Sequence, residues 1–134
     1  MQYLLLIYGN ETAMLSASKE TAGQMLAAYG AYTEAIKKAG VYVGSNRLRP
    51  TSDATSVRIS NDKTKVLNGP YAETKEQLGG YYMIDVPDLD AALSWASRCP
   101  GANYGTIEVR PIWEIEAAAR LETAVGSRAA RAAG

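Results

Sequence analysis

The sequence predicts an α+β domain in which two helices cover one face of a largely antiparallel sheet. Three observations lead to this prediction. Segments with an apolar residue at every second position, the period of a strand, alternate with two segments that repeat at helical spacing. A turn signal joins two of the strand segments directly, as in an antiparallel hairpin. The length of 134 residues and the apolar fraction of 47% are ordinary for one globular domain.

The first half of the chain predicts a strand, a long helix and a second strand. The apolar run at residues 3–8 predicts a buried strand. Ser16 or Ser18 is suited to cap a helix that ends at about Lys38. A strand is expected to follow over residues 41–48. The stripe expected to be buried on the helix consists of Met25, Tyr29, Tyr32 and Ile36, widened by Ala22, Leu26 and Ala35.

The middle of the chain predicts a hairpin. Residues 55–60 alternate apolar and polar side chains, which predicts a half-buried strand with Val57 and Ile59 on its inner face. Asn61-Asp62-Lys63 is a turn signal, and residues 65–67 supply the returning strand.

The remaining segments predict a strand, a helix and a last strand. The strand covers residues 80–86, and Gly79-Gly80 predicts a bulge or a close approach of two backbones at its start. Asp88 is a natural helix cap, and a last strand is expected at residues 106–115. The stripe expected to be buried on this second helix is Leu89, Leu93 and Ala96.

This order of elements predicts a ferredoxin-like split βαβ fold with an inserted hairpin. Both helices would lie on one face of the sheet, and the other face would still carry apolar groups. Because a second subunit is the commonest cover for such a face, we expect a homodimer. We assign residues 1–115 to the domain and residues 116–134, rich in Ala and Arg, to a tail that is a frayed helix or disordered.

Charge and composition exclude several function classes. Fourteen basic residues balance fourteen acidic ones, so we expect neither nucleic acid nor an anionic membrane as a partner. With no histidine and one cysteine, Ser-His-Asp and Cys-His pairs are excluded, and we expect no metal and no cofactor. Cys99 lies at the end of a predicted helix, where a thiolate is disfavoured, so we expect a structural role. A single cysteine fits a reducing compartment, which favours a cytoplasmic protein.

One long segment resembles a known family signature. Residues 68–82 read Asn-Gly-Pro-Tyr-Ala-Glu-Thr-Lys-Glu-Gln-Leu-Gly-Gly-Tyr-Tyr and resemble the signature of the DGPF group within the YCII-related proteins. Residues 5–9, 85–90 and 108–112 match the same group in the same order, so the resemblance covers about residues 1–115. It implies a ferredoxin-like fold of the dimeric α/β-barrel type, in agreement with the order of elements.

The resemblance implies less about activity. The wider YCII-related group is proposed to hold a His/Asp pair in a cleft, and the DGPF branch is often found near sigma factors of the extracytoplasmic-function class. This chain has no histidine, and Asn68 stands where the DGPF motif has its aspartate. The catalytic pair is therefore not carried over, and the family setting makes a sigma factor a candidate partner.

The loop that contains the signature is the first candidate site. After a stiff Gly-Pro turn, Glu73, Lys75 and Glu76 are expected to project together. A lysine between two carboxylates can bind a small acid or hold a proton donor where desolvation shifts a pKa. We therefore name Glu73 and Lys75 as candidate catalytic residues and Asn68 as a candidate ligand contact. The alternative is a turn whose charges are solvated and whose Tyr71 fills the core.

The last strand is the second candidate site. Its period of two places Glu108 and Arg110 on one face of the sheet. Arg110 suits a carboxylate or phosphate through its forked N–H donors, and Glu108 is a candidate catalytic carboxylate. Tyr8 and Asp85 lie at strand ends and are candidate ligand contacts expected in the same cleft. The alternative for Glu108 and Arg110 is an ion pair that fixes the dimer.

Three functions stay open from the sequence. The first is a protein that binds a small anionic molecule, as a binding protein or an enzyme, in a polar cleft at the sheet face of the dimer. Arg110 and Lys75 would hold the anion there, and Glu73 or Glu108 would handle the proton. The second is a non-enzymatic regulatory module that acts on a protein such as a sigma factor. The third, a cofactor-free oxygenase, rests on fold analogy alone.

Overall fold

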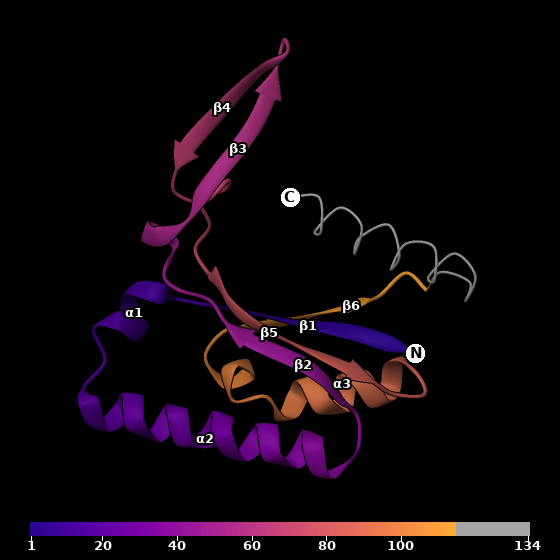
Figure 1. The fold of residues 1–134 in the computed structure, drawn as a ribbon. Coiled ribbons are helices and arrows are strands. Elements are labelled where there is room, and N and C mark those ends of the chain that lie inside the picture. The colour runs from indigo at the N-terminus through magenta and orange to yellow at the C-terminus, as the bar shows by residue number, and fades with distance from the viewer. Residues whose placement is uncertain (115–134) are drawn as a thin grey trace, which may run out of the picture.

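The computed structural model describes residues 1–114 and contains six strands and three α-helices in that range. The strands are β1 (Gln2–Gly9), β2 (Tyr42–Arg47), β3 (Thr55–Ser60), β4 (Lys63–Asn68), β5 (Gln77–Asp85) and β6 (Thr106–Pro111). The helices are α1 (Glu11–Leu15), α2 (Lys19–Lys38) and α3 (Leu89–Arg98), with 3₁₀ turns at Thr51–Asp53 and Pro100–Asn103. Four strands form one sheet in the order β2-β5-β1-β6, while β3 and β4 pair only with each other. Both long helices, α2 and α3, lie on the same face of the sheet (Figure 1).

The order of the strands is that of the ferredoxin-like split βαβ fold. The two central strands, β1 and β5, pair antiparallel to each other. Outside them, β2 pairs antiparallel with β5, and β6 pairs antiparallel with β1. Two units, β1-α2-β2 and β5-α3-β6, therefore interlock, each with the other unit's central strand between its own two strands. The predicted fold class, including the inserted hairpin and the helices on one face, is confirmed.

The core lies between the sheet and the two long helices. Its buried members are Tyr3, Leu5, Tyr32, Ile36, Tyr82, Ile84, Val86, Ala92, Ala96 and Cys99. Tyr32 joins three elements, because its hydroxyl donates to the Trp95 carbonyl at 2.6 Å and its ring meets the Tyr82 ring edge-on at 5.1 Å. The phenol is therefore satisfied inside the core, as a buried polar group must be.

Both long helices begin at capping residues that the sequence indicates. The Ser18 hydroxyl accepts the Thr21 N–H at 3.1 Å, and the Asp88 carboxylate accepts the Ala91 N–H at 2.9 Å. Such caps typically contribute about 1 kcal/mol each. At its other end, α2 stops at Lys38, as predicted.

The glycine pair near the start of β5 forms a bulge. Ile7 pairs with Gly80 and Tyr8 pairs with Leu78, so Gly79 has no partner on β1. The extra residue reverses the face on which the residues before it lie, because side chains alternate with period two. A Cβ on Gly80 would lie 2.8 Å from the Asn46 carbonyl oxygen, which shows how closely β2 approaches β5. The bulge and the close backbone approach are both confirmed.

The β3-β4 hairpin projects from the sheet on the side away from α2 and α3 (Figure 1). Its turn residues Asn61 and Asp62 have φ values of 51° and 61°, the left-handed conformation that two-residue hairpin turns require. The expectation of a half-buried β3 is wrong, since Val57 is 61% exposed and Ile59 is 72% exposed. Alternation in the sequence indicates an apolar face, but it does not reveal whether another element covers that face.

The buried faces of the helices agree only in part with those expected. On α2, Tyr32 and Ile36 are buried as expected, whereas Leu26 is exposed. On α3, Ala96 is buried as expected, but Leu89 and Leu93 are exposed. Ala92 is buried in their place. Small side chains at these contacts let the helix backbone approach the sheet closely, which leaves the leucines at the margin.

The end of the last strand differs from the expected one, and the expected tail is not described. β6 ends at Pro111, four residues before the expected end. The tail expected at 116–134 lies outside the described residues. Within residues 1–114, no helix is both long enough and apolar enough to span a membrane.

Two glycine substitutions should change stability in opposite directions. Gly105→Ala would place a Cβ into the Tyr8 carbonyl and 3.0 Å from the Gly9 Cα, so we expect a loss of about 1–3 kcal/mol. Gly30→Ala on α2 meets no atom within 4 Å and should gain about 0.5–1 kcal/mol through helix propensity. Urea unfolding followed by circular dichroism measures both. An unchanged or raised stability of Gly105→Ala would contradict the packing described for Gly105, and a loss in Gly30→Ala would contradict the open space described for Gly30.

The tyrosine cluster should make the fold sensitive to alkali. Burial raises the pKa of three tyrosines in this cluster, Tyr29, Tyr32 and Tyr82. In the unfolded chain these phenols ionise near pH 10, whereas the folded state keeps its protons, so stability should fall as pH rises above about 10. Tyr32→Phe loses the bond to the Trp95 carbonyl, about 1 kcal/mol at neutral pH, and this deficit should shrink above pH 10.

The matched control is Tyr104→Phe, because the Tyr104 ring is 75% exposed. Unfolding curves at a series of pH values should show the same alkaline loss for this variant as for the parent. An alkaline loss in Tyr32→Phe as steep as that of the parent would show that the buried phenol does not contribute.

Candidate functional site

A pocket of about 350 Å³ lies where the hairpin joins the sheet. The end of β1, the start of β5 and the two segments that lead into and out of the hairpin form its wall. Both apolar and polar side chains line this pocket, which we call the hairpin-base pocket. Its lining residues are Tyr8, Leu48, Arg49, Thr51, Ala54, Pro70, Ala72, Thr74, Gln77 and Leu78.

Backbone hydrogen bonds hold the two connecting segments in place. The Leu48 N–H donates to the Gly79 carbonyl at 2.9 Å, which continues the sheet beyond the end of β2. The Gly69 N–H donates to the Ala54 carbonyl at 2.6 Å, and the Ser56 hydroxyl donates to the Gly69 carbonyl at 2.8 Å. These bonds close the base of the hairpin and fix the wall of the pocket.

Glu11, the first residue of the short helix α1, forms hydrogen bonds with two pocket residues, Thr51 and Gln77. The Glu11 carboxylate accepts both the N–H and the hydroxyl of Thr51, and the Glu11 N–H donates to the Gln77 side chain at 2.9 Å. No helix is predicted from the sequence between the first strand and Ser16. Asn10, which caps α1 by accepting the Ala13 N–H at 3.0 Å, is the signal that could have revealed it.

The signature loop presents only every second residue to the pocket. Pro70, Ala72 and Thr74 line it, whereas Glu73 and Lys75 lie outside its wall, although all five residues are exposed. The structure therefore does not bring the Glu73 and Lys75 side chains into the pocket.

Two other residues of this region also differ from expectation. Tyr71 does not fill the core, because it is 77% exposed and its ring lies 5.8 Å from the Arg58 guanidinium. Asn68 pairs with Thr55 at the end of β4, is exposed, and is not a pocket residue.

Tyr8 connects the pocket to the acidic and basic pair on β6. Its hydroxyl donates to Glu108 Oε1 at 3.5 Å, and Glu108 Oε2 lies 3.8 Å from Arg110 Nε. Three of the residues predicted for the site are thus brought together. Glu108 and Arg110 pair with each other along one strand, and at this exposure such a pair contributes at most about 1 kcal/mol. The cross-strand or intersubunit pair considered as the alternative stays a prediction.

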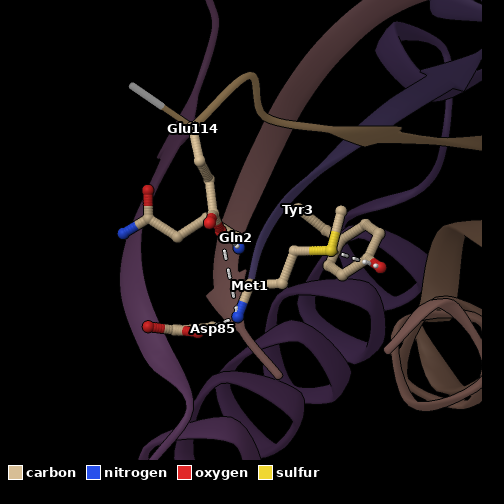
Figure 2. Close-up of polar contacts among 5 residues, drawn as sticks. All are labelled: Met1, Gln2, Tyr3, Asp85 and Glu114. Carbon is tan, nitrogen blue, oxygen red and sulfur yellow. Dashed lines mark hydrogen bonds and ion pairs between the residues drawn. The ribbon is translucent and has the colours of Figure 1, made fainter. Parts of the chain in front are cut away.

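Asp85 lies at the opposite end of the sheet from Tyr8. On β1, Gln2 pairs with Asp85 whereas Tyr8 pairs with Leu78, a separation of about 20 Å along the strand. Figure 2 shows Asp85 beside the Met1 amine, with which it forms an ion pair at 2.9 Å. The hydrogen bond that the amine donates to this carboxylate raises the pKa of the amine. The expectation that Asp85 and Tyr8 share a cleft is wrong, because antiparallel pairing sets the end of β5 against the start of β1.

Cys99 lies inside the core between α3 and the turn that follows it. Its side chain is fully buried, and burial raises the pKa of the thiol. A buried neutral thiol is a poor nucleophile, so the structural role expected from the sequence agrees with its surroundings.

Thiol chemistry provides a direct check of this burial. In the folded protein Cys99 should react with a disulfide reagent such as DTNB far more slowly than a cysteine introduced at the exposed position Ser97 by Ser97→Cys. In urea both thiols should react at once. Rapid modification of the parent in buffer would show that Cys99 is accessible.

Comparison with known proteins places the chain in a family. The model of the YCII-related domain matches residues 1–116. An uncharacterized protein of Rhizobium meliloti (strain 1021) is 40% identical over 114 residues, which span 84% of this chain and 92% of that protein.

Among solved structures, the chain is similar to the 5-chloro-2-hydroxyhydroquinone dehydrochlorinase TftG from Burkholderia phenoliruptrix AC1100, in complex with 2,5-dihydroxybenzoquinone. The TM-score is 0.49 at 14% identity, over 85% of this chain and 94% of that one. The family model and the identity with the rhizobial protein show that the chain belongs to the YCII-related family.

Proposed function

We propose that the protein binds a small molecule with an anionic group in the hairpin-base pocket. The observation that carries this proposal is the pocket itself, whose volume of about 350 Å³ suits a small ring or a short-chain acid. Apolar residues such as Leu48 and Leu78 would contact the body of the ligand. Tyr8 and Arg49 supply polar donors at the wall. A few polar groups in a mainly apolar wall are typical of sites that bind and orient small molecules.

Arg49 is the residue best suited to hold the anionic group. It lines the pocket, its side chain is 85% exposed, and its Nε pairs with Asp53 at 3.0 Å. Only one N–H takes part in that contact, and a guanidinium carries five, so the others can bind a carboxylate or phosphate. Arg49 thereby takes the place that the sequence assigned to Lys75.

Glu108 is the better placed of the two carboxylates considered for proton transfer. It contacts Tyr8, which lines the pocket, whereas Glu73 contacts no pocket residue by hydrogen bond or ion pair within residues 1–114. A ligand oxygen near the Tyr8 hydroxyl could exchange a proton with Glu108 through that hydroxyl. Arg110 lies on the other side of Glu108, with its Nε 3.8 Å from Glu108 Oε2.

The finer family assignment is also a proposal. The signature over residues 68–82 supports membership of the DGPF branch, with Asn68 in place of the motif aspartate. The regulatory module acting on a sigma factor, the cofactor-free oxygenase and the cytoplasmic location stay predictions.

A thermal-shift screen of small carboxylic acids, phenols and phosphate esters tests the proposed pocket. A ligand that binds only the folded state adds about 2.7 kcal/mol of stability when its concentration is a hundred times its Kd. The melting temperature therefore rises. Arg49→Gln should weaken binding roughly ten- to hundredfold, because a charge-assisted contact is lost. Tyr8→Phe should weaken the binding of any ligand that accepts a hydrogen bond from the Tyr8 hydroxyl.

The matched control is Arg58→Gln, which removes an arginine of the hairpin that does not line the pocket. It should leave the ligand response unchanged. An equal response in the parent, Arg49→Gln and Tyr8→Phe would place the binding elsewhere on the molecule. If no compound in any of the three classes raised the melting temperature of the parent, that result would contradict the proposal.

A further inference from the structure

One side of the β3-β4 hairpin is apolar and exposed. The pairing sets Val57 opposite Val66 and Ile59 opposite Thr64, so branched side chains gather on this side. Val57, Val66 and Ile59 are 61%, 62% and 72% exposed, in that order. We call this side the apolar hairpin face. Exposed apolar side chains that cluster in this way are typical of a contact surface.

The opposite side of the hairpin is basic. Arg58 pairs directly with Lys65, and Lys63 lies two residues before Lys65 on β4, so three cations share this side. All three are exposed, and none forms an ion pair with a carboxylate of residues 1–114. Like charges set directly opposite each other destabilise a pair of strands. The hairpin therefore contains a repulsion that an acidic side chain beside Lys65 would relieve.

Both strands of the hairpin have an unpaired edge. Within residues 1–114, β3 and β4 pair only with each other, and no backbone hydrogen bond joins them to another strand. The hairpin stands clear of the four-stranded sheet (Figure 1). The outer edge of each strand thus presents N–H and C=O groups at every second residue. Because two strands alone are marginally stable in water, a third strand would stabilise the hairpin.

The edge of β4 has a more regular chemical pattern than the edge of β3. Along β4, the lysines at 63 and 65 alternate with the branched residues Thr64 and Val66. β3 carries one cation, Arg58, whose guanidinium lies 5.8 Å from the Tyr71 ring. A strand added to β4 would set its side chains beside those of β4 on both faces. The complement of this edge is therefore an extended segment in which acidic and apolar residues alternate.

We infer that the β4 edge binds an extended segment of another protein, in which Glu or Asp alternates with branched apolar residues. The segment adds a third strand through its backbone. Its carboxylates lie beside Lys63 and Lys65, and its apolar side chains extend the apolar hairpin face.

Two other occupants fit this edge less well. A second copy of the hairpin, paired edge to edge about a two-fold axis, would set the lysines of both copies side by side, and like charges in neighbouring strands repel. A nucleic acid has the complementary charge, but it cannot continue the backbone ladder and would leave the apolar hairpin face in water.

Fluorescence anisotropy with a labelled synthetic peptide tests this edge. The probe is an acetylated peptide in which glutamate and valine alternate, and a second probe carries lysine in place of every glutamate. The parent should bind the glutamate peptide and not the lysine peptide. Lys65→Glu should weaken binding of the glutamate peptide roughly ten- to hundredfold, because an attraction becomes a repulsion. The matched control is Lys19→Glu, which makes the same change of charge on α2 and should bind like the parent.

The loss in Lys65→Glu should not come from unfolding, because the new carboxylate lies opposite Arg58 and forms a favourable cross-strand pair. Circular dichroism verifies this. A third peptide is N-methylated at a central valine and at the glutamate beside it. One of these two residues faces β4, so its missing N–H should weaken binding roughly tenfold although the charge is unchanged.

Four results would overturn the inference. The first is a glutamate peptide that fails to bind the parent at about 1 mM. The second is equal binding to the parent and to Lys65→Glu. The third is binding that N-methylation leaves unchanged, which would show a contact through charge alone. The fourth is a labelled oligouridylate that binds the parent more tightly than the peptide does. None of these measurements involves the hairpin-base pocket, so they are independent of the function proposed for it.

Discussion

The antiparallel pairing of β1 with β5 is the constraint on which the rest of the structure depends. It sorts the residues of both strands into two sets, because side chains alternate across a sheet. One set, with Leu5 and Ile84, is fully buried beneath α2 and α3. The other set, with Leu4 and Met83, faces away from both helices. The same pairing brings the start of β1 to the end of β5, which separates Asp85 from the pocket.

Local features of the chain could be predicted from its sequence, because their causes are local. Ser18 and Asp88 cap the helices since their side-chain oxygens accept N–H groups three residues ahead. The turn at Asn61-Asp62 follows from residues that tolerate a positive φ. The exposure of Ile59 could not be predicted, because alternation gives a strand an apolar face whether or not a second layer covers it. Likewise, the spacing of Leu89 and Leu93 could not reveal that alanines make the closer contact.

The candidate site was predicted in part for the same reason. Glu108 and Arg110 share a face because they lie two residues apart on one strand, and the structure adds Tyr8 from the neighbouring strand. Arg49 was missed because its place at the pocket depends on how the hairpin joins the sheet. The charged residues of the signature loop were the predicted site residues, but the small side chains of that loop line the pocket. In an irregular segment, residue type alone does not indicate which side chains face inward.

The bulge at Gly79 has a consequence for how this chain can change in length. It places Leu78 and Tyr8 as a pair, and both line the pocket. Deleting Gly79 would remove the bulge and place Leu78 directly before Gly80, on the opposite side of the sheet from Gly80 and still paired with Tyr8, while every residue from Gly80 to Asp85 kept its partner on β1. Such a deletion would spare both the core and the pairing of Leu78 with Tyr8. Insertions at the hairpin turn, which touches neither, should also be accommodated, so the bulge and the hairpin turn are two places where the chain can change in length.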